Sequence, residues 1–167
     1  MSKLKRWWNH FSIGRWQLRR RFPAPVLQAI EQAVRDCETL HSGEIRFVVE
    51  AALPLDAIFA GLGPRQRAIE LFAQLRVWDT EHNNGVLIYV LFADRAVEIV
   101  ADRGVSGEHV AAREWDDVCR QMEVAFKAGQ FEQGAVAGVH GIADVLARHA
   151  PGVRSGSNEQ PDAPILL

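Results

Sequence analysis

Apolar residues recur at helical spacing in some stretches of this chain and form short continuous runs in others. Leu27, Ile30, Val34 and Cys37 follow one another at i, i+3, i+7 and i+10, which is typical of an amphipathic helix. This spacing and the flanking prolines and glycines predict four helices, over 25–40, 64–75, 107–128 with Ser106 as its cap, and 131–149. Apolar, β-branched runs predict three strands over 44–52, 85–92 and 96–101.

The connections between these elements predict how the strands pair. Only residues 93–95 separate the second and third strands, so these two form an antiparallel hairpin. The long connection through the helix at 64–75 favours a parallel crossover between the first strand and the second. The strand over 85–92 is apolar at nearly every position, as in strands that are covered on both faces. We therefore expect a small α/β sandwich with a short mixed sheet.

Charge divides the chain into unequal parts. Residues 1–22 contain seven lysines and arginines and no acid, whereas residues 23–167 carry a formal charge of −9. We predict a basic aromatic arm at 1–22, a folded domain at 23–150 and a disordered tail at 151–167, where Gly, Ser, Asn, Gln and Pro dominate.

The arm also contains Trp7, Trp8, Phe11 and Trp16. Three interpretations stay open. The tryptophans pack on the domain or on a second subunit while the arginines are solvated, or the arm binds an anionic membrane surface, or it binds nucleic acid, which we expect least. Gly14 argues against a single continuous amphipathic helix.

Several classes of chemistry are excluded by composition and spacing. No apolar run reaches the roughly 18 residues of a membrane-spanning helix, and no signal peptide is recognisable, so a cytoplasmic location is expected. The chain has no phosphate-binding Gly-Lys-Ser/Thr loop, no Gly-x-Ser-x-Gly elbow and no His-Glu-x-x-His motif. Cys37 and Cys119 lie within predicted helices, where we expect small core residues rather than nucleophiles.

Oxygen-bearing side chains gather at one end of the predicted sheet. The two parallel strands start at this end and the third strand finishes there. A hard cation such as Ca²⁺ or Mg²⁺ prefers oxygen ligands of this kind. The alternative is that the Asn-Asn-Gly sequence is a turn and that the acids cap nearby backbone. The candidate metal ligands are Asp79, Asn83, Asn84, Asp102, Glu44 and Glu38.

Four segments of the chain resemble the TPM-domain family. They are residues 44–49, the Trp-Asp-Thr-Glu-His-Asn-Asn-Gly-Val-Leu-Ile-Tyr-Val run at 78–90, Val-Glu-Ile-Val-Ala-Asp-Arg-Gly at 97–104, and Phe-Lys-Ala-Gly-Gln-Phe-Glu-Gln-Gly at 126–134. The resemblance covers about residues 25–149. It implies a three-layer α/β/α sandwich, divalent-cation binding in an acidic loop region, and roles in acid phosphatase chemistry or in the assembly of membrane complexes near LemA-type membrane proteins.

Two functions follow from the residues and the resemblance together. The first is a binding or assembly module that associates with a membrane protein of the LemA type, peripherally at the inner membrane face. The second is a metal-assisted acid phosphatase that hydrolyses phosphate monoesters. There the cation would polarise a phosphoryl oxygen and activate a water that Asp79 positions. The small-residue helix at 131–149 and the lack of an assignable nucleophile favour the first.

Overall fold

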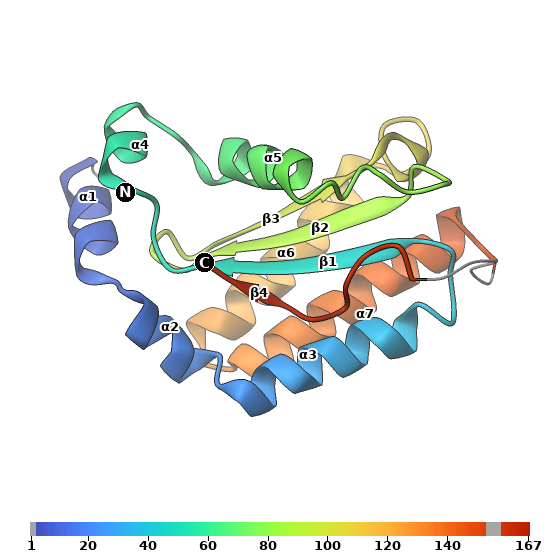
Figure 1. Ribbon diagram of the computed structural model, residues 1–167, viewed down its shortest axis with the longest axis horizontal. Coiled ribbons are helices and arrows are strands. Elements are labelled where there is room, and N and C mark those ends of the chain that lie inside the picture. Colours follow the sequence, from blue (N-terminus) through green and yellow to red (C-terminus); the bar gives the residue numbers. More distant parts are fainter. Residues whose placement is uncertain (1–2, 153–157) are drawn as a thin grey trace.

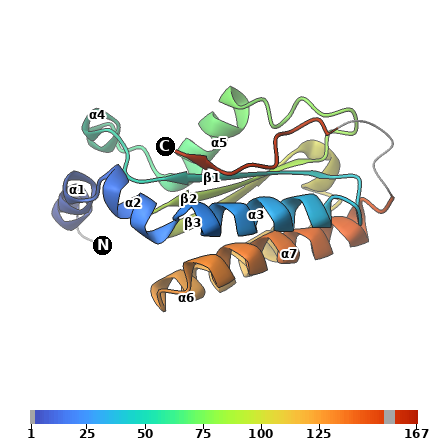
Figure 2. The same cartoon turned by 60° about the horizontal axis from the view of Figure 1, so that its bottom comes forward.

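The computed structural model of the chain describes residues 3–152 and 158–167. A four-stranded mixed sheet separates two helical layers (Figures 1 and 2). The strands are β1 (Glu44–Glu50), β2 (Gly85–Leu91), β3 (Ala96–Ala101) and β4 (Ile165–Leu166), in the order β3-β2-β1-β4. One face is covered by α3 (Ala24–Cys37), α6 (Ala112–Lys127) and α7 (Phe131–His149), and the other by α5 (Pro64–Gln74). The predicted three-layer sandwich is confirmed.

Strand pairing follows the predicted topology. β1 and β2 are parallel, with Glu44 opposite Gly85, and β2 and β3 form an antiparallel hairpin with Val86 opposite Ala101. Every residue of β1 and β2 is buried, because the sheet carries helices on both faces. The N-terminal ends of β1 and β2 therefore lie beside the C-terminal end of β3.

Two hydrophobic clusters form the core, one on each face of the sheet. Alternate residues of each strand enter different clusters: Phe47 and Ile88 contact the α3–α7 side, whereas Val48 and Leu87 contact the α5 side. α7 lies close to α6 because its small residues leave room, and a Cβ on Gly138 would approach Met122 Sδ to 2.3 Å. The small-residue face of α7 is thus occupied by α6.

The helices differ from the sequence prediction in several places, and α3 ends at Cys37 rather than at residue 40. α4 (Leu55–Phe59) and a short 3₁₀ turn (Arg103–Val105) were not predicted, since each is too short to show an apolar period. The expected cap at Ser106 is wrong. α6 begins at Ala112 instead, after extended backbone at Ala111, which makes no side-chain cap hydrogen bond.

The prediction of a disordered C-terminal tail is wrong for residues 158–167. β4 pairs in parallel with β1, Val48 opposite Ile165 and Val49 opposite Leu166. Arg46 donates hydrogen bonds to the carbonyls of Pro161 and Ala163. Most of the tail is polar, but its last three residues, 165–167, are apolar and pack against the two core clusters. They meet the unpaired edge of β1, which forms backbone hydrogen bonds with them. Residues 153–157 of the predicted tail lie outside the described residues.

The predicted arm forms two helices, α1 (Lys3–Ser12) and α2 (Arg15–Arg21), which break at Ile13 and Gly14. α2 is fixed to the core by Leu18 and Phe22, both buried. The arm lies near the β2–β3 turn, at the end of the sheet opposite the N-terminal ends of β1 and β2 (Figure 1).

Candidate functional site

Three predicted ligands meet at one end of the sheet. Glu44 begins β1 opposite Gly85, and the backbone N–H of Asp102 donates to Gly85 O at 2.9 Å, so these residues stand in one row across the three strands. Asn84 directly precedes Gly85. We call Glu44, Asn84 and Asp102, with the loop 77–84, the acidic rim. The convergence predicted from strand directions is present.

Two glycines seat the loop 77–84 on the sheet. A Cβ on Gly85 would lie 1.9 Å from the carbonyl oxygen of Val77. A Cβ on Gly104 would lie 2.6 Å from Asn83 O and 2.7 Å from His82 O. Both contacts are with backbone, which cannot swing aside as a side chain can. Only glycine at these two positions allows the loop to pack directly against β2 and the turn after β3.

Asn84 is 2% exposed and is held in a single orientation. Its Nδ2 donates to Ser42 O at 2.8 Å, and its backbone N–H donates to Thr80 Oγ1 at 3.1 Å. Its Oδ1 is buried and has no hydrogen-bond partner among the described residues. Buried polar atoms are nearly always paired with protein, water or an ion, so we expect this oxygen to meet a water or an ion.

Asp102, which follows β3, also has a buried side-chain oxygen without a hydrogen-bond partner among the described residues. Its Oδ1 accepts from the backbone N–H of Arg103 at 2.7 Å and caps the 3₁₀ turn. Its Oδ2 is buried and makes no hydrogen bond within the described part of the chain. One carboxylate oxygen thus fixes the turn, and the other is left for an external partner.

The two glutamates are buried at this end of the molecule. Glu44 is fully buried, and its Oε1 accepts from the backbone N–H of Glu159 at 3.4 Å. Glu38 is 4% exposed and is the C-cap residue of α3. The contact with Glu159 brings the C-terminal segment over the rim. Sequence reasoning missed it because nothing local in residues 158–167 indicates where they bind.

The remaining two candidates are placed differently. Asn83 has a φ of 53°, and its Oδ1 accepts from Arg103 Nε at 3.0 Å and Nη2 at 2.7 Å, so an arginine already occupies this oxygen. Asp79 is exposed, and no hydrogen bond or ion pair joins its carboxylate to the other candidates in the residues that the structure describes. The candidate site therefore centres on Asn84, Asp102 and Glu44.

The donor set restricts the kind of metal that fits. In residues 3–152 and 158–167, no group of three or more His, Cys, Asp or Glu side chains is arranged to hold a metal ion. A closed protein cage of the transition-metal type therefore does not fit. Mg²⁺ commonly keeps several waters and uses only one or two carboxylates, and Ca²⁺ also takes amide and backbone oxygens. Asn84 Oδ1 and Asp102 Oδ2 are oxygens of the type that these hard cations bind.

Thiol chemistry is disfavoured at both cysteines. Burial raises the pKa of Cys37 to about 11 and that of Cys119 to about 12. A thiol with so high a pKa contains little thiolate near neutral pH, and the thiolate is the nucleophile. Cys37 Sγ lies 3.3 Å from His140 Nδ1, which is a contact between helices α3 and α7. The expectation of structural cysteines agrees with this burial.

Polar contacts fix α1 to the domain at the other end of the sheet. Arg6 forms an ion pair with Asp94 at 2.9 Å, and His10 Nε2 lies 3.0 Å from the same carboxylate. The backbone N–H of Leu53 donates to His10 Nδ1 at 2.9 Å, so the proton of a neutral His10 ring lies on Nε2 and points to Asp94. No local pattern predicts this network, because its partners are more than 40 residues apart in the sequence.

The opposite side of the arm carries exposed apolar side chains. Trp8 is 60%, Phe11 62% and Trp16 71% exposed. Packing on the domain is therefore wrong for Trp8 and Trp16, whereas packing on a second subunit stays a prediction. Arg6, expected to be solvated, instead pairs with Asp94. Within the described residues, no helix has the length and apolar character needed to cross a bilayer. We call Leu4, Trp8, Phe11 and Trp16, with the neighbouring arginines, the aromatic face.

Comparison with known families and structures gives consistent results. The family model described as the TPM domain matches residues 22–145. The fold is similar to the NMR structure of BA42 protein from the psychrophilic bacterium Bizionia argentinensis, with a TM-score of 0.72 and 32% sequence identity. That similarity covers 86% of this chain and 94% of the other. A search of curated proteins gave no match.

Proposed function

The chain belongs to the TPM-domain family, and from this premise we propose that it is a binding module whose acidic rim takes up a divalent cation, Ca²⁺ or Mg²⁺. We further propose that it works peripherally at the inner face of a membrane, beside a membrane protein of the LemA type. One observation carries the cation proposal. Two buried side-chain oxygens at the rim, Asn84 Oδ1 and Asp102 Oδ2, make no hydrogen bond within the described residues.

Charge and geometry support a cation rather than an anion at these atoms. Both atoms are acceptors, and Asp102 carries a full negative charge when ionised. A cation bound there would supply a fixed positive charge at the ends of three strands. Because the same rim holds Arg103 against Asn83 and Glu159 against the loop 77–84, a bound ion can order segments that are distant in sequence. Such ordering is how a cation can control a binding surface.

Replacing Asp102 by asparagine is the direct test of the cation site. Asp102→Asn keeps an oxygen for the Arg103 N–H but removes the charge, so the fold should persist while Mg²⁺ and Ca²⁺ bind at least about tenfold more weakly. The measurement is a titration of the isotopically labelled full chain with each ion, followed by amide NMR shifts. The wild type should show saturable shifts at residues 83–85 and 102–104.

Asp116→Asn is the matched control, since Asp116 is an exposed carboxylate on α6 away from the rim. It should bind each ion as the wild type does. Flat or scattered shifts in the wild type, or equal affinity in Asp102→Asn, would contradict the cation site.

The aromatic face supports the membrane proposal. Residues 1–22 carry no acid, and the ring of Trp16 lies 5.7 Å from the guanidinium of Arg20. Arginine beside exposed tryptophan suits the boundary between anionic headgroups and acyl chains. The other side of α1 is fixed to the domain through Arg6 and His10. These contacts hold α1 in one orientation, with its exposed rings toward solvent. A cluster of exposed apolar side chains of this kind usually marks a surface that binds a membrane or a protein.

Vesicle sedimentation tests this proposal. The wild type should sediment with phosphatidylglycerol vesicles and much less with phosphatidylcholine vesicles, because anionic lipid attracts the arginines. Trp8→Ala/Trp16→Ala should weaken binding to the anionic vesicles by about tenfold or more, since the loss of inserted ring area costs more than about 1.4 kcal/mol. High salt should weaken the wild type as well.

Trp78→Ala is the control for this double variant. Trp78 is also an exposed tryptophan, 48% accessible, but it lies in the loop of the acidic rim. It should sediment like the wild type. Equal binding to both lipids, or no loss in Trp8→Ala/Trp16→Ala, would contradict a membrane surface and point to a protein partner for the aromatic face.

No specific contact favours the phosphatase alternative. Arg103 lies beside Asp102 and is the natural phosphate ligand at this rim, but its guanidinium is bonded to Asn83. Asp79, the expected water-positioning residue, is exposed, and no hydrogen bond holds its carboxylate in place among the described residues. The phosphatase alternative makes a separate prediction. The protein would hydrolyse a phosphate monoester only with Mg²⁺, and Asp102→Asn would abolish this activity. That result would show an enzyme rather than a binding module.

A further inference from the structure

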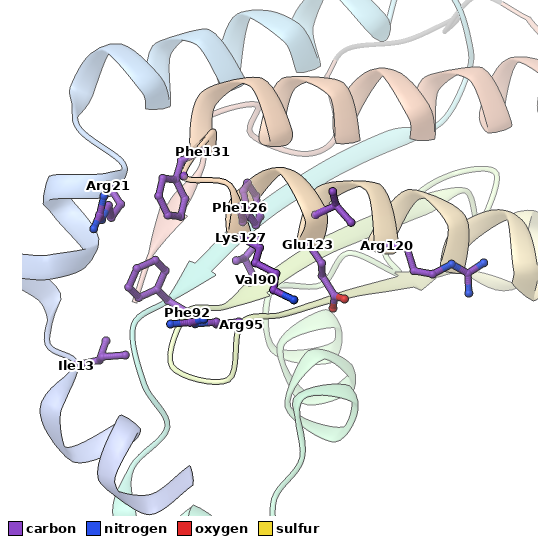
Figure 3. A pocket seen from close by; sticks show the side chains of 12 residues that line it. Ile13, Arg21, Val90, Phe92, Arg95, Arg120, Glu123, Phe126, Lys127 and Phe131 are labelled. Atoms are coloured by element: carbon purple, nitrogen blue, oxygen red, sulfur yellow. The ribbon is translucent and has the colours of Figure 1, made fainter. Parts of the chain in front are cut away.

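A cleft of about 730 Å³ lies at the end of the sheet opposite the acidic rim. Figure 3 shows its walls: Ile13 and Arg21 come from the arm, Phe92 and Arg95 from the β2–β3 hairpin, and Lys127 from the end of α6. Ligand sites commonly have volumes of about 300–1,000 Å³ and mostly apolar walls with a few polar groups. This cleft has that size and is independent of the cation site.

Aromatic rings form the floor of the cleft. The rings of Phe126 and Phe131 are stacked with centroids 5.6 Å apart, and Phe92 lies 5.9 Å from Phe131. Phe22, fully buried, supports Phe131 edge-on from beneath at 5.6 Å. The three lining rings are each only partly buried, so part of their apolar surface is left for a ligand.

Positive charge surrounds this floor. Four basic side chains line the cleft against one acid, Glu123, whose Oε1 accepts from the backbone N–H of Val97 at 3.1 Å. Arg21 lies over the ring of Phe131 at 5.4 Å, and neither Arg95 nor Lys127 forms an ion pair within the described residues. The basic residues of the lining are Arg21, Arg95, Arg120 and Lys127.

Arg95 lies in the turn between β2 and β3. Its φ is 54°, in the left-handed region where glycine or asparagine is favoured, so the turn geometry does not select an arginine. The nearest acid in sequence, Asp94, is already bonded to Arg6 and His10 and does not neutralise it. The backbone conformation at position 95 therefore does not explain the arginine, and we attribute it to the positive charge that it brings to the cleft.

We propose that this cleft binds a single-chain amphiphilic carboxylate, with its hydrocarbon chain on the phenylalanine floor and its carboxylate among Arg95, Lys127 and Arg21. The apolar floor alone would bind any apolar molecule, and the cations alone would bind any anion. Their combination selects a ligand that is apolar along its body and negative at one end. The excess of positive charge around the cleft disfavours a cationic amphiphile of the same length.

The test uses the labelled full chain and dodecanoate below its critical micelle concentration. We expect saturable amide shifts at residues 92–95 and 124–131. Acetate, which has the charge without the chain, and dodecyltrimethylammonium, which has the chain with the opposite charge, should leave these amides unshifted. Equal shifts with dodecyltrimethylammonium, or none with dodecanoate, would overturn the proposal.

Val124→Glu is the variant of choice because Val124 lines the cleft yet is 69% exposed, so the fold does not depend on it. It should weaken dodecanoate binding by about tenfold or more, since it adds a negative charge to the wall of a cleft that binds an anion. Ile69→Glu, at an exposed site on α5 across the sheet, is the matched control and should bind as the wild type does. Lys127→Gln should weaken binding too, whereas Arg113→Gln, at the far end of α6, should not.

A vesicle experiment separates the cleft from the aromatic face. Val124→Glu should sediment with phosphatidylglycerol vesicles as the wild type does, even though it no longer binds dodecanoate. If Val124→Glu loses vesicle binding and dodecanoate binding together, the cleft is part of a lipid-headgroup surface, and the single-chain carboxylate is the wrong ligand.

Discussion

Gly85→Ala should lower the free energy of unfolding by more than about 3 kcal/mol, or prevent folding at 37 °C. The added methyl group would lie 1.9 Å from Val77 O, which is a backbone atom. Relief requires moving the loop 77–84 or bending the start of β2, which pairs with Glu44 on one side and Asp102 on the other. The measurement is urea unfolding followed by far-UV circular dichroism.

Gly63→Ala is the matched control for this variant. No atom lies within 4 Å of the position that a Cβ on Gly63 would take, and its φ of −97° suits any residue. This change should alter the free energy of unfolding by less than about 1 kcal/mol. If Gly85→Ala is as stable as Gly63→Ala, the loop is not packed against β2 as described, and the geometry of the acidic rim is wrong with it.

Arg67→Met should destabilise the fold by about 3–5 kcal/mol, because it leaves the buried carboxylate of Glu50 without its positive partner. Arg67 on α5 donates to both oxygens of Glu50, from Nε and Nη2 at 3.0 Å each. The hydroxyl of Tyr89 donates to the same carboxylate at 2.6 Å. Burial and the hydrogen bond to this carboxylate raise the pKa of Tyr89 well above its usual range.

A double-mutant cycle distinguishes a buried charge from simple loss of packing. Arg67→Met/Glu50→Gln should be more stable than Arg67→Met alone, since the neutral amide no longer needs the guanidinium. Arg120→Met is the matched control, because its ion pair with Asp117 is exposed on both sides and should contribute less than about 1 kcal/mol. A single Arg67→Met as stable as Arg120→Met would contradict a buried, charge-dependent contact between α5 and the sheet.

These two contacts are linked through the chain. The Arg67–Glu50–Tyr89 contact fixes α5 across β1 and β2, and α5 leads within three residues to Val77 and the loop of the acidic rim. The rim is therefore positioned from two sides, by α5 before the loop and by Gly85 after it. Gly85 accepts a backbone hydrogen bond from Asp102, so Gly85→Ala should also disturb the cation site directly. Arg67→Met makes no such contact and should affect cation binding only by disturbing the fold.

Much of the fold follows from local signals. The antiparallel hairpin was predictable because three residues cannot make a parallel return, and the predicted strand over 96–101 and helix over 131–149 match β3 and α7. The rim could be predicted in outline, since the direction of the strands places Glu44, Asn84 and Asp102 at one end of the sheet. The sequence could not show which of the six candidate ligands are available. Asn83, for example, is occupied by Arg103 through a tertiary contact between residues that are 20 positions apart.

The sequence by itself determined four main helices, three strands and their order, and the end of the sheet where oxygen ligands gather. These depend on apolar periodicity and connection length, which act within a few residues. The tertiary structure alone decided that the tail adds β4, that Trp8 of α1 is exposed, and which rim oxygens are buried without partners among the described residues. Each of these depends on a partner distant in the sequence: β1 for the tail, Asp94 for Arg6, and Ser42 for Asn84. Such pairings come from packing, and no local pattern records them.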